Sequence, residues 1–186
     1  MVFLLGKKFK TDQIWREKKV IPVTVIKAEP NTVSIVRTAA RDGYTAVQLK
    51  LGREAREFRT SEEQLKVGDT VSVETFKEGD VVRVSGTTKG RGFQGVVKRH
   101  GFSGGPKTHG QKNRHRMPGS IGNTTPQRVI PGRRMAGHMG VDRVTVKNLM
   151  VVGVDKEKNT LLLRGAVPGA RGGLLEIQKL EMKAKK

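Results

Sequence analysis

Short apolar runs with polar residues at alternate positions recur in both flanks of the chain, and β-branched residues dominate them. Alternation at a period of two, bounded by Gly, Pro, Asn and Asp, is typical of β-strands. One segment, 61–68, instead has a helix pattern, because Ser61 can cap it and Gly68 can end it. Residues 155–159 are predicted to form a hairpin turn between two strands. The predicted strands are 1–15, 20–30, 32–39, 44–52, 70–76, 81–86, 143–155, 160–167 and 174–180.

Strands of this length and spacing favour a mainly β protein built on a small, closed antiparallel β-barrel. Residues 1–86 and 141–186 are predicted to meet in one barrel core. The alternation is lost in residues 87–140, which are predicted to be a long, irregular, glycine-rich basic extension. An irregular segment of that length is uncommon in a lone domain, so we expect a partner to order it.

Charge is distributed unevenly along the chain. There are 37 Lys and Arg against 17 Asp and Glu, which gives a formal net charge of +20. Residues 81–141 contain no acidic residue, yet they hold 12 of the Lys and Arg, 13 of the 23 Gly and all four His. This excess predicts a polyanionic partner, and nucleic acid is favoured over a membrane surface. No run approaches the roughly 18 apolar residues of a membrane-spanning helix.

The hexapeptide GRGFQG at 90–95 matches the G-x-G-x-x-G pattern of dinucleotide-binding folds. That fold also needs a βαβ unit and an acidic residue about 20 positions later, and the acid-free segment offers neither. No nucleotide cofactor is therefore predicted. The glycines either punctuate a loop or let the backbone approach phosphates, and we favour the second interpretation. Phe93, between these glycines, is predicted to be the apolar pin where the extension leaves the barrel.

Several kinds of chemistry have no support in the sequence. The chain has no cysteine, which excludes disulfides and Cys-ligated metals. His109 and His115 lie six positions apart, and no nearby carboxylate could complete a metal site. Ser103 and Ser120 have His residues near them in sequence but no acidic residue to orient a triad. We therefore expect no enzyme, no metal and no small-molecule substrate, and the order of charges at the N-terminus does not predict a signal peptide.

The acid-free segment supplies the candidate site residues. About ten phosphate contacts would lower affinity by roughly three to five decades between 50 and 200 mM salt. The side chains predicted to bind RNA are Lys89, Arg91, Lys98, Arg99, His100, Lys107, His109, Lys112, Arg114, His115, Arg116, Arg128, Arg133, Arg134 and His138. The glycines predicted to bring backbone close to RNA are Gly90, Gly92, Gly95, Gly119, Gly122, Gly132, Gly137 and Gly140.

A series of motifs in fixed order resembles the universal L-three family of large-subunit ribosomal proteins, in its bacterial form. The motifs are GTTKGRGFQGVVKRHGF at 86–102, THG at 108–110, HRMPGSIG at 115–122, RRMAGHMG at 133–140 and RVTV at 143–146. The resemblance implies a non-enzymatic protein of the cytoplasmic ribosome, with a β-barrel of the translation-protein type. It also implies a loop that extends through rRNA toward the peptidyl-transferase centre, contact with the 3′-terminal region of that rRNA, early binding in assembly, and neighbouring ribosomal proteins as partners.

The sequence departs from the family pattern at two places. Only REAREFR at 53–59 stands where bacterial relatives usually carry a longer insertion after the strand matching 44–52. The loop tip is one residue shorter, so a Gln methylated in some relatives falls at or near Thr124, and methylation is not expected. The predicted tip near the peptidyl-transferase centre comprises Asn123, Thr124, Thr125, Pro126 and Gln127. The alternative function is a free nucleic-acid-binding assembly chaperone or regulator.

Overall fold

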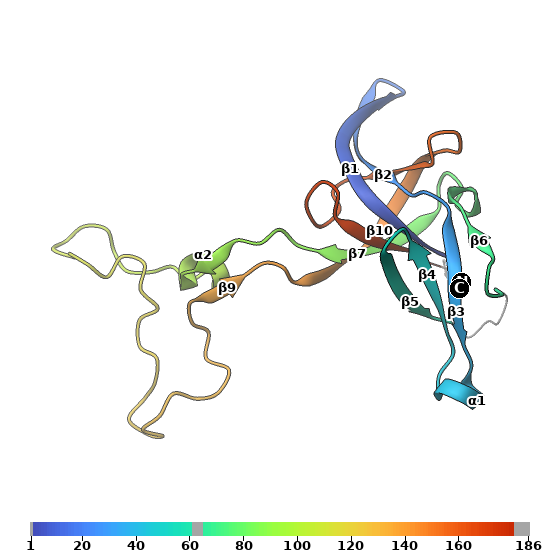
Figure 1. Ribbon diagram of the computed structural model, residues 1–186. Helices are drawn as coiled ribbons and strands as arrows, with labels where there is room; N and C mark the ends of the chain where they lie inside the picture. The colour runs from blue at the N-terminus through green and yellow to red at the C-terminus, as the bar shows by residue number, and fades with distance from the viewer. Residues whose placement is uncertain (1, 61–64, 181–186) are drawn as a thin grey trace, which may run out of the picture. The chain divides into compact units, whose positions relative to one another are not determined.

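The computed structural model describes residues 2–60 and 65–180, and it is mainly β with few helices (Figure 1). The chain divides into two compact units. Unit 1 comprises Met1–Thr88 and Arg143–Lys186, and unit 2 comprises Lys89–Asp142. Unit 2 is therefore a single insertion between two stretches of chain that fold together.

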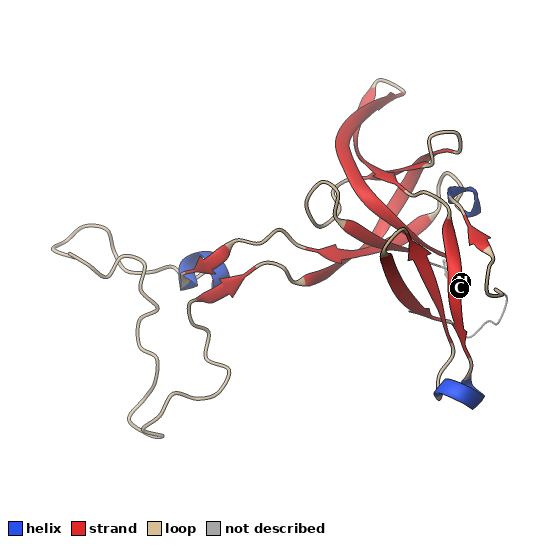
Figure 2. Ribbon diagram, in the orientation of Figure 1, coloured by secondary structure: helices blue, strands red, loops and turns tan. Residues whose placement is uncertain are grey.

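Six antiparallel strands of unit 1 form a closed ring in the order β1, β12, β7, β10, β11 and β2, with β2 pairing back to β1 (Figure 2). Three of these strands precede unit 2 and three follow it, and strands from the two flanks pair with one another, so both flanks contribute to one sheet. The ring strands are β1 (Phe3–Arg16), β2 (Lys19–Lys27), β7 (Val81–Thr87), β10 (Arg143–Asp155), β11 (Thr160–Arg164) and β12 (Leu174–Lys179).

A second, four-stranded sheet of unit 1 has the order β5, β4, β3 and β6. Its β4–β5 hairpin turns through only Gly52 and Arg53, and the positive φ of 61° at Gly52 suits the first position of such a turn. The strands are β3 (Asn31–Arg37), β4 (Ala46–Leu51), β5 (Glu54–Arg59) and β6 (Thr70–Val71), with α1 (Ala39–Asp42) and a 3-10 turn η1 (Val73–Thr75) beside them.

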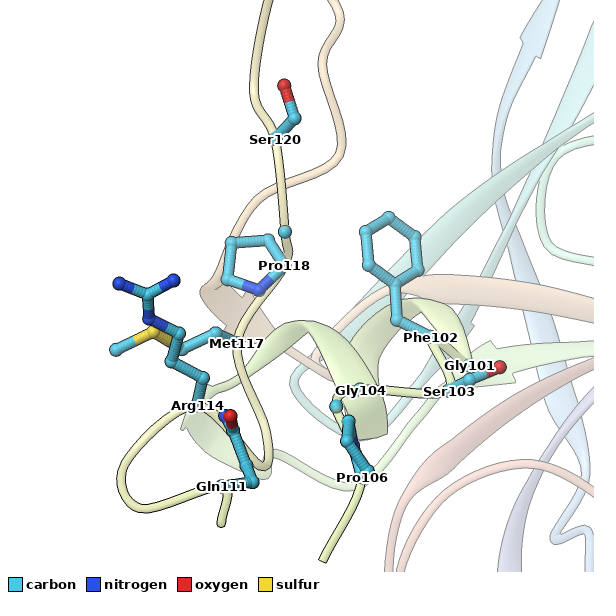
Figure 3. Close-up of a pocket in the computed structure, with 12 residues that line it drawn as sticks. Gly101, Phe102, Ser103, Gly104, Pro106, Gln111, Arg114, Met117, Pro118 and Ser120 are labelled. Carbon is cyan, nitrogen blue, oxygen red and sulfur yellow. The ribbon is translucent and has the colours of Figure 1, made fainter. Parts of the chain in front are cut away.

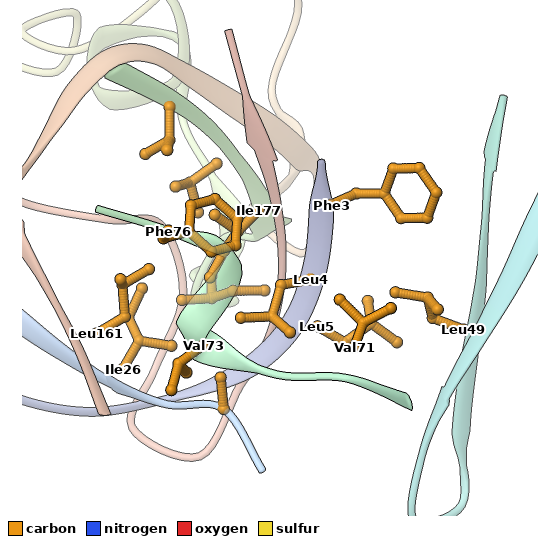
Figure 4. Close-up of a cluster of buried hydrophobic side chains, with 14 of the residues drawn as sticks. Phe3, Leu4, Leu5, Ile26, Leu49, Val71, Val73, Phe76, Leu161 and Ile177 are labelled. Carbon is orange, nitrogen blue, oxygen red and sulfur yellow. The ribbon is translucent and has the colours of Figure 1, made fainter. Parts of the chain in front are cut away.

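The two sheets of unit 1 share one hydrophobic core (Figure 4). The rings of Phe3 from β1 and Phe58 from β5 stack with centroids 4.7 Å apart. Leu4 and Ile177 are fully buried in the same cluster. Close packing is also visible at Gly6, where a Cβ would lie 2.6 Å from Ile26 Cγ2. Burial of these side chains is the main stabilising contribution to unit 1.

The strand predictions agree closely with the structure, and 143–155 coincides with β10. The segment 70–76 was predicted as one strand, but it extends only over Thr70–Val71 before η1, because Ser72 Oγ accepts a hydrogen bond from Glu74 N and caps a turn. Of the predicted helix 61–68, residues 61–64 lie outside the described residues and 65–68 are not helical. There the N–H of Gly68 donates to Val33 O, which ties the chain to β3 instead.

Unit 2 has little regular structure (Figures 1 and 2). A short antiparallel ribbon joins β8 (Gly92–Gln94) to β9 (Gly137–Met139), and the five-residue helix α2 (Val96–His100) follows β8 directly. Irregular backbone connects α2 to β9. Val96 is the only fully buried apolar side chain of unit 2, so this unit lacks a hydrophobic core of its own.

Candidate nucleic-acid interface

The predicted RNA-binding side chains all lie in unit 2, and twelve of the fifteen are exposed to solvent. With no Asp or Glu from 81 to 141, these charges have no acidic partner along their own segment. A dense set of exposed Lys and Arg on irregular backbone complements a folded polyanion. The exposed members of the set are therefore accessible to a partner, and their contact with phosphates stays a prediction.

The other three predicted side chains are half-buried and bind the protein's own backbone. Arg99 Nη1 donates to Met135 O at 2.7 Å, and His100 Nε2 lies 3.0 Å from the same oxygen. His115 Nδ1 lies 2.9 Å from Pro106 O. These contacts join α2 to the chain entering β9 and close the loop that contains His109. Arg99, His100 and His115 thus have a structural role inside unit 2 that the sequence pattern did not predict.

One of the predicted glycines, Gly140, is required by backbone contacts within unit 2, and a second, Gly137, lies close to a side chain. Gly140 is buried with φ of 89°, and a Cβ there would collide with Lys89 O and lie 2.9 Å from Gly90 Cα. A Cβ at Gly137 would lie 2.8 Å from Arg99 Nη1. By contrast, a Cβ at Gly95 would meet nothing within 4 Å. Close approach of backbone is therefore observed at Gly137 and Gly140, with protein as the neighbour; approach to RNA stays a prediction for the whole set.

The remaining predicted glycines have conformational reasons or open surroundings. Gly92, Gly119 and Gly132 have φ of 68°, 80° and 83°, a region that favours glycine. A Cβ at Gly122 would make only an ordinary contact with Arg128 O at 3.7 Å. Within 90–95, Gly95 ends the β8 segment and precedes α2, while β8 pairs with the antiparallel β9. The hexapeptide is thus part of a β-ribbon and not of a βαβ unit.

The prediction for Phe93 is wrong. Its side chain is 77% exposed, so it does not pin the segment to any apolar surface. The buried apolar side chain of this region is instead Val96, the first residue of α2. The exposure of Phe93 cannot be read from the local sequence.

An open pocket of about 950 Å³ lies between the loop after α2 and the segment 111–120 (Figure 3). The two segments cross closely: Gly105 N–H donates to His115 O at 2.9 Å, and a Cβ at Gly104 would collide with that oxygen. Figure 3 shows the Phe102 ring and Pro118 on this pocket, with Arg114 and Met117 from the second segment. The lining combines apolar side chains with one cationic side chain, that of Arg114.

The predicted loop tip is exposed throughout residues 123–127, and the Thr125–Pro126 peptide is cis. Near its base, the Arg133 guanidinium donates to Ser120 O, and Ser120 Oγ donates to Gly122 O at 2.8 Å. The first of these hydrogen bonds joins the two sides of the loop below the tip, and the second is local to one side. Arg133 is exposed, but its guanidinium already donates one hydrogen bond within the loop.

Unit 1 differs because its carboxylates bind its own cations. Burial opposes ionisation of Asp80, but hydrogen bonds from Lys179 Nζ at 2.7 Å and from Lys77 N–H at 2.9 Å outweigh it, so the pKa of Asp80 is lowered. The Arg37 guanidinium, 2.8 Å from Glu57 Oε1, lowers the pKa of that carboxyl, and the Tyr44 hydroxyl donates to it at 3.0 Å. Such pairs reduce the positive charge that unit 1 offers to a partner.

Across 2–60 and 65–180, no cluster of three or more His, Asp or Glu side chains could hold a metal ion. Within the same ranges, no helix is long and apolar enough to cross a membrane.

Comparison with known proteins gives consistent matches over nearly the whole chain. The family model described as "Ribosomal protein L3" matches residues 7–162. The chain is 48% identical over 208 aligned positions to "Large ribosomal subunit protein uL3" of Herpetosiphon aurantiacus, covering 98% of each chain. It is 45% identical over 207 positions to the protein of that name from Alcanivorax borkumensis, again covering 98% of each chain. The protein of that name from Dehalococcoides mccartyi is 45% identical over 198 positions, covering 95% of this chain and 97% of the relative.

These aligned lengths exceed the 186 residues of this chain, so the relatives carry residues that have no counterpart here. The motif resemblance is confirmed by the family model and by bacterial relatives at this level of identity. The chain belongs to the ribosomal protein L3 family.

Proposed function

We propose that this protein is a structural, non-enzymatic constituent of the large ribosomal subunit in the cytoplasm, and that it binds large-subunit rRNA through unit 2. The observation that carries the proposal is the composition and burial of unit 2. It has twelve exposed basic or His side chains, no acidic residue before Asp142, and a single buried apolar side chain. A segment of this kind gains order mainly from a polyanion that neutralises it.

The finer details of the proposal rest on the family resemblance. The ring of unit 1 acts as a translation-protein-type β-barrel that docks on rRNA near its 3′ end and joins neighbouring ribosomal proteins. Residues 87–140 penetrate the rRNA and bring the tip, 123–127, toward the peptidyl-transferase centre. Binding early in assembly follows from this arrangement, because a thin loop is enclosed most readily before the RNA helices around it have closed.

Sedimentation in sucrose gradients tests whether the protein is an integral subunit component. In a high-salt gradient, we expect the protein to stay with the large particle, because the enclosed loop cannot leave without opening the RNA. A free assembly chaperone or regulator would be released to the top of the gradient. That release would refute the structural role.

Deletion of residues 104–135 tests the loop itself. The deletion removes irregular backbone of unit 2 and leaves the strands of both sheets in unit 1. We expect unit 1 to fold, with normal far-ultraviolet circular dichroism, while cells that carry only this variant accumulate incomplete large subunits. Normal subunits with normal peptide transfer would contradict the role proposed for the loop.

A further inference from the structure

The exposed ring of Phe93 lies opposite another exposed ring in the β8–β9 ribbon. Phe93 and His138 are direct partners in the antiparallel register, and both are exposed. Direct partners project from the same face of a ribbon, with Cβ atoms about 4.5–5.5 Å apart. The two rings therefore stand side by side on one face, while Gly92, Gln94, Gly137 and Met139 belong to the other.

The second face of the ribbon is covered from within unit 2. Arg99 of α2 lies against Gly137, where a Cβ would come within 2.8 Å of Nη1, and the same guanidinium donates to Met135 O. Arg91 Nη1 lies 3.8 Å from Met139 Sδ on that covered face. The Phe93–His138 face carries no such cover, and Phe93 is 77% exposed. The ribbon thus presents an aromatic pair to an external partner.

We propose that Phe93 and His138 form a platform on which one unpaired nucleobase of the bound rRNA stacks, an inference that rests on the function proposed above. Aromatic and His rings are the usual surfaces on which unstacked RNA bases lie. Electrostatics favours a nucleotide over an apolar protein surface, because Lys89 is exposed in the chain leading into β8 and no acidic residue occurs between 81 and 141. The base covers the rings while a flanking phosphate meets this cation.

Affinity of the full chain for in vitro transcribed large-subunit rRNA, measured at several salt concentrations, tests the platform. The Phe93→Ala variant loses one stacked base and is expected to bind about 5- to 100-fold more weakly. Its salt slope is expected to stay unchanged, because no phosphate contact is lost. Phe93→Tyr and Phe93→Trp should bind like wild type. Phe93→Leu is the matched control, because it keeps an apolar side chain of similar size without a ring, and it should bind as weakly as Phe93→Ala.

Ultraviolet crosslinking gives a second readout that affinity does not. Irradiation of the wild-type complex should yield a peptide with a nucleotide attached at Phe93, identified by mass spectrometry. The Phe93→Leu complex should lack that adduct. Far-ultraviolet circular dichroism checks that the β-sheets of unit 1 are folded in every variant.

The outcomes separate the platform from the proposed function. Equal affinity of wild type and Phe93→Ala, with normal salt dependence, would overturn the platform and leave rRNA binding intact. Wild-type affinity in Phe93→Leu, with loss in Phe93→Ala, would also overturn it, because an apolar protein contact would then explain the site. Absence of salt-dependent binding by wild type would instead refute the rRNA-binding function, and the platform with it.

Discussion

Unit 1 and unit 2 reach an ordered structure by different means. Unit 1 closes a six-stranded ring and packs a second sheet over a shared apolar core. Unit 2 buries a single apolar side chain, that of Val96, and is held by a two-stranded ribbon, a five-residue helix and backbone contacts of Arg99, His100 and His115. One chain can thus combine a unit that is stabilised by burial of apolar side chains with a unit that depends on a partner to order its irregular backbone.

The largest expected difference between the two units is the loss in free energy of unfolding when a large apolar side chain is shortened. Leu161 is fully buried in unit 1, and Leu161→Ala is expected to lower the free energy of unfolding by about 2–5 kcal/mol. Ile130 of unit 2 is 59% exposed, and Ile130→Ala should change that free energy by no more than about 0.5 kcal/mol. Urea unfolding followed by circular dichroism measures both. Similar losses in the two variants would contradict the contrast between the units.

Within unit 2, close contacts between backbone segments are expected to contribute more to stability than burial of apolar side chains. Gly140→Ala must avoid Lys89 O and adopt a φ of 89°, so we expect the base of the ribbon to open at a cost of about 1–3 kcal/mol. Hydrogen exchange at the Arg91 amide, which donates to Met139 O at 2.9 Å, reports this opening. Gly95→Ala is the control, because its φ of −70° and open surroundings allow a side chain. Unchanged exchange in Gly140→Ala would show that the crossing is not required.

Acid should destabilise unit 1 selectively. The pKa of Asp80 is below its usual 3.8, so folded protein binds fewer protons there than unfolded protein. The stabilisation is therefore complete above about pH 4 and disappears as pH falls through the lowered pKa. Asp80→Asn should cost about 1–3 kcal/mol near neutral pH and reduce the loss on acidification. Urea unfolding between pH 2.5 and 7 measures this. An identical pH profile in wild type and Asp80→Asn would exclude Asp80 as a source of acid sensitivity.

The smallest expected effects come from single Arg→Ala substitutions in unit 2. They should distinguish an exposed cation, which is expected to bind RNA, from a cation that supports the protein backbone. Arg134→Ala removes an exposed charge, so the slope of log affinity against log salt should become shallower by about 1. Arg99→Ala removes the support of Met135 O, so faster proteolysis of unit 2 is the expected result. Filter binding at graded salt and limited trypsin digestion separate the two. An unchanged slope in Arg134→Ala would count against phosphate contact by that residue. Arg133→Ala should combine both effects, since that side chain also holds Ser120 O.

The strands are most predictable from the sequence where apolar and polar residues alternate strongly. Residues 143–155 coincide with β10, and the turn at 155–159 lies between β10 and β11 as predicted. Glu54–Arg59 was missed as a strand, because charged residues dominate it and only pairing with β4 and burial of Phe58 make it one. At Val73–Thr75 the sequence predicts a strand, but the structure has a 3-10 turn, because the Ser72 side chain caps it.

The location of the charge, the flanks that carry strands and the family resemblance follow from residue type and order alone. Only the folded chain shows that Phe93 faces solvent, that Val96 is buried, and that Arg99 donates a hydrogen bond to Met135 O. Those outcomes depend on residues brought together from positions more than thirty apart, and on which face of a short ribbon the helix covers. The local sequence pattern cannot supply that information. Either face of the ribbon could be the exposed one until a segment distant in sequence packs against the other face.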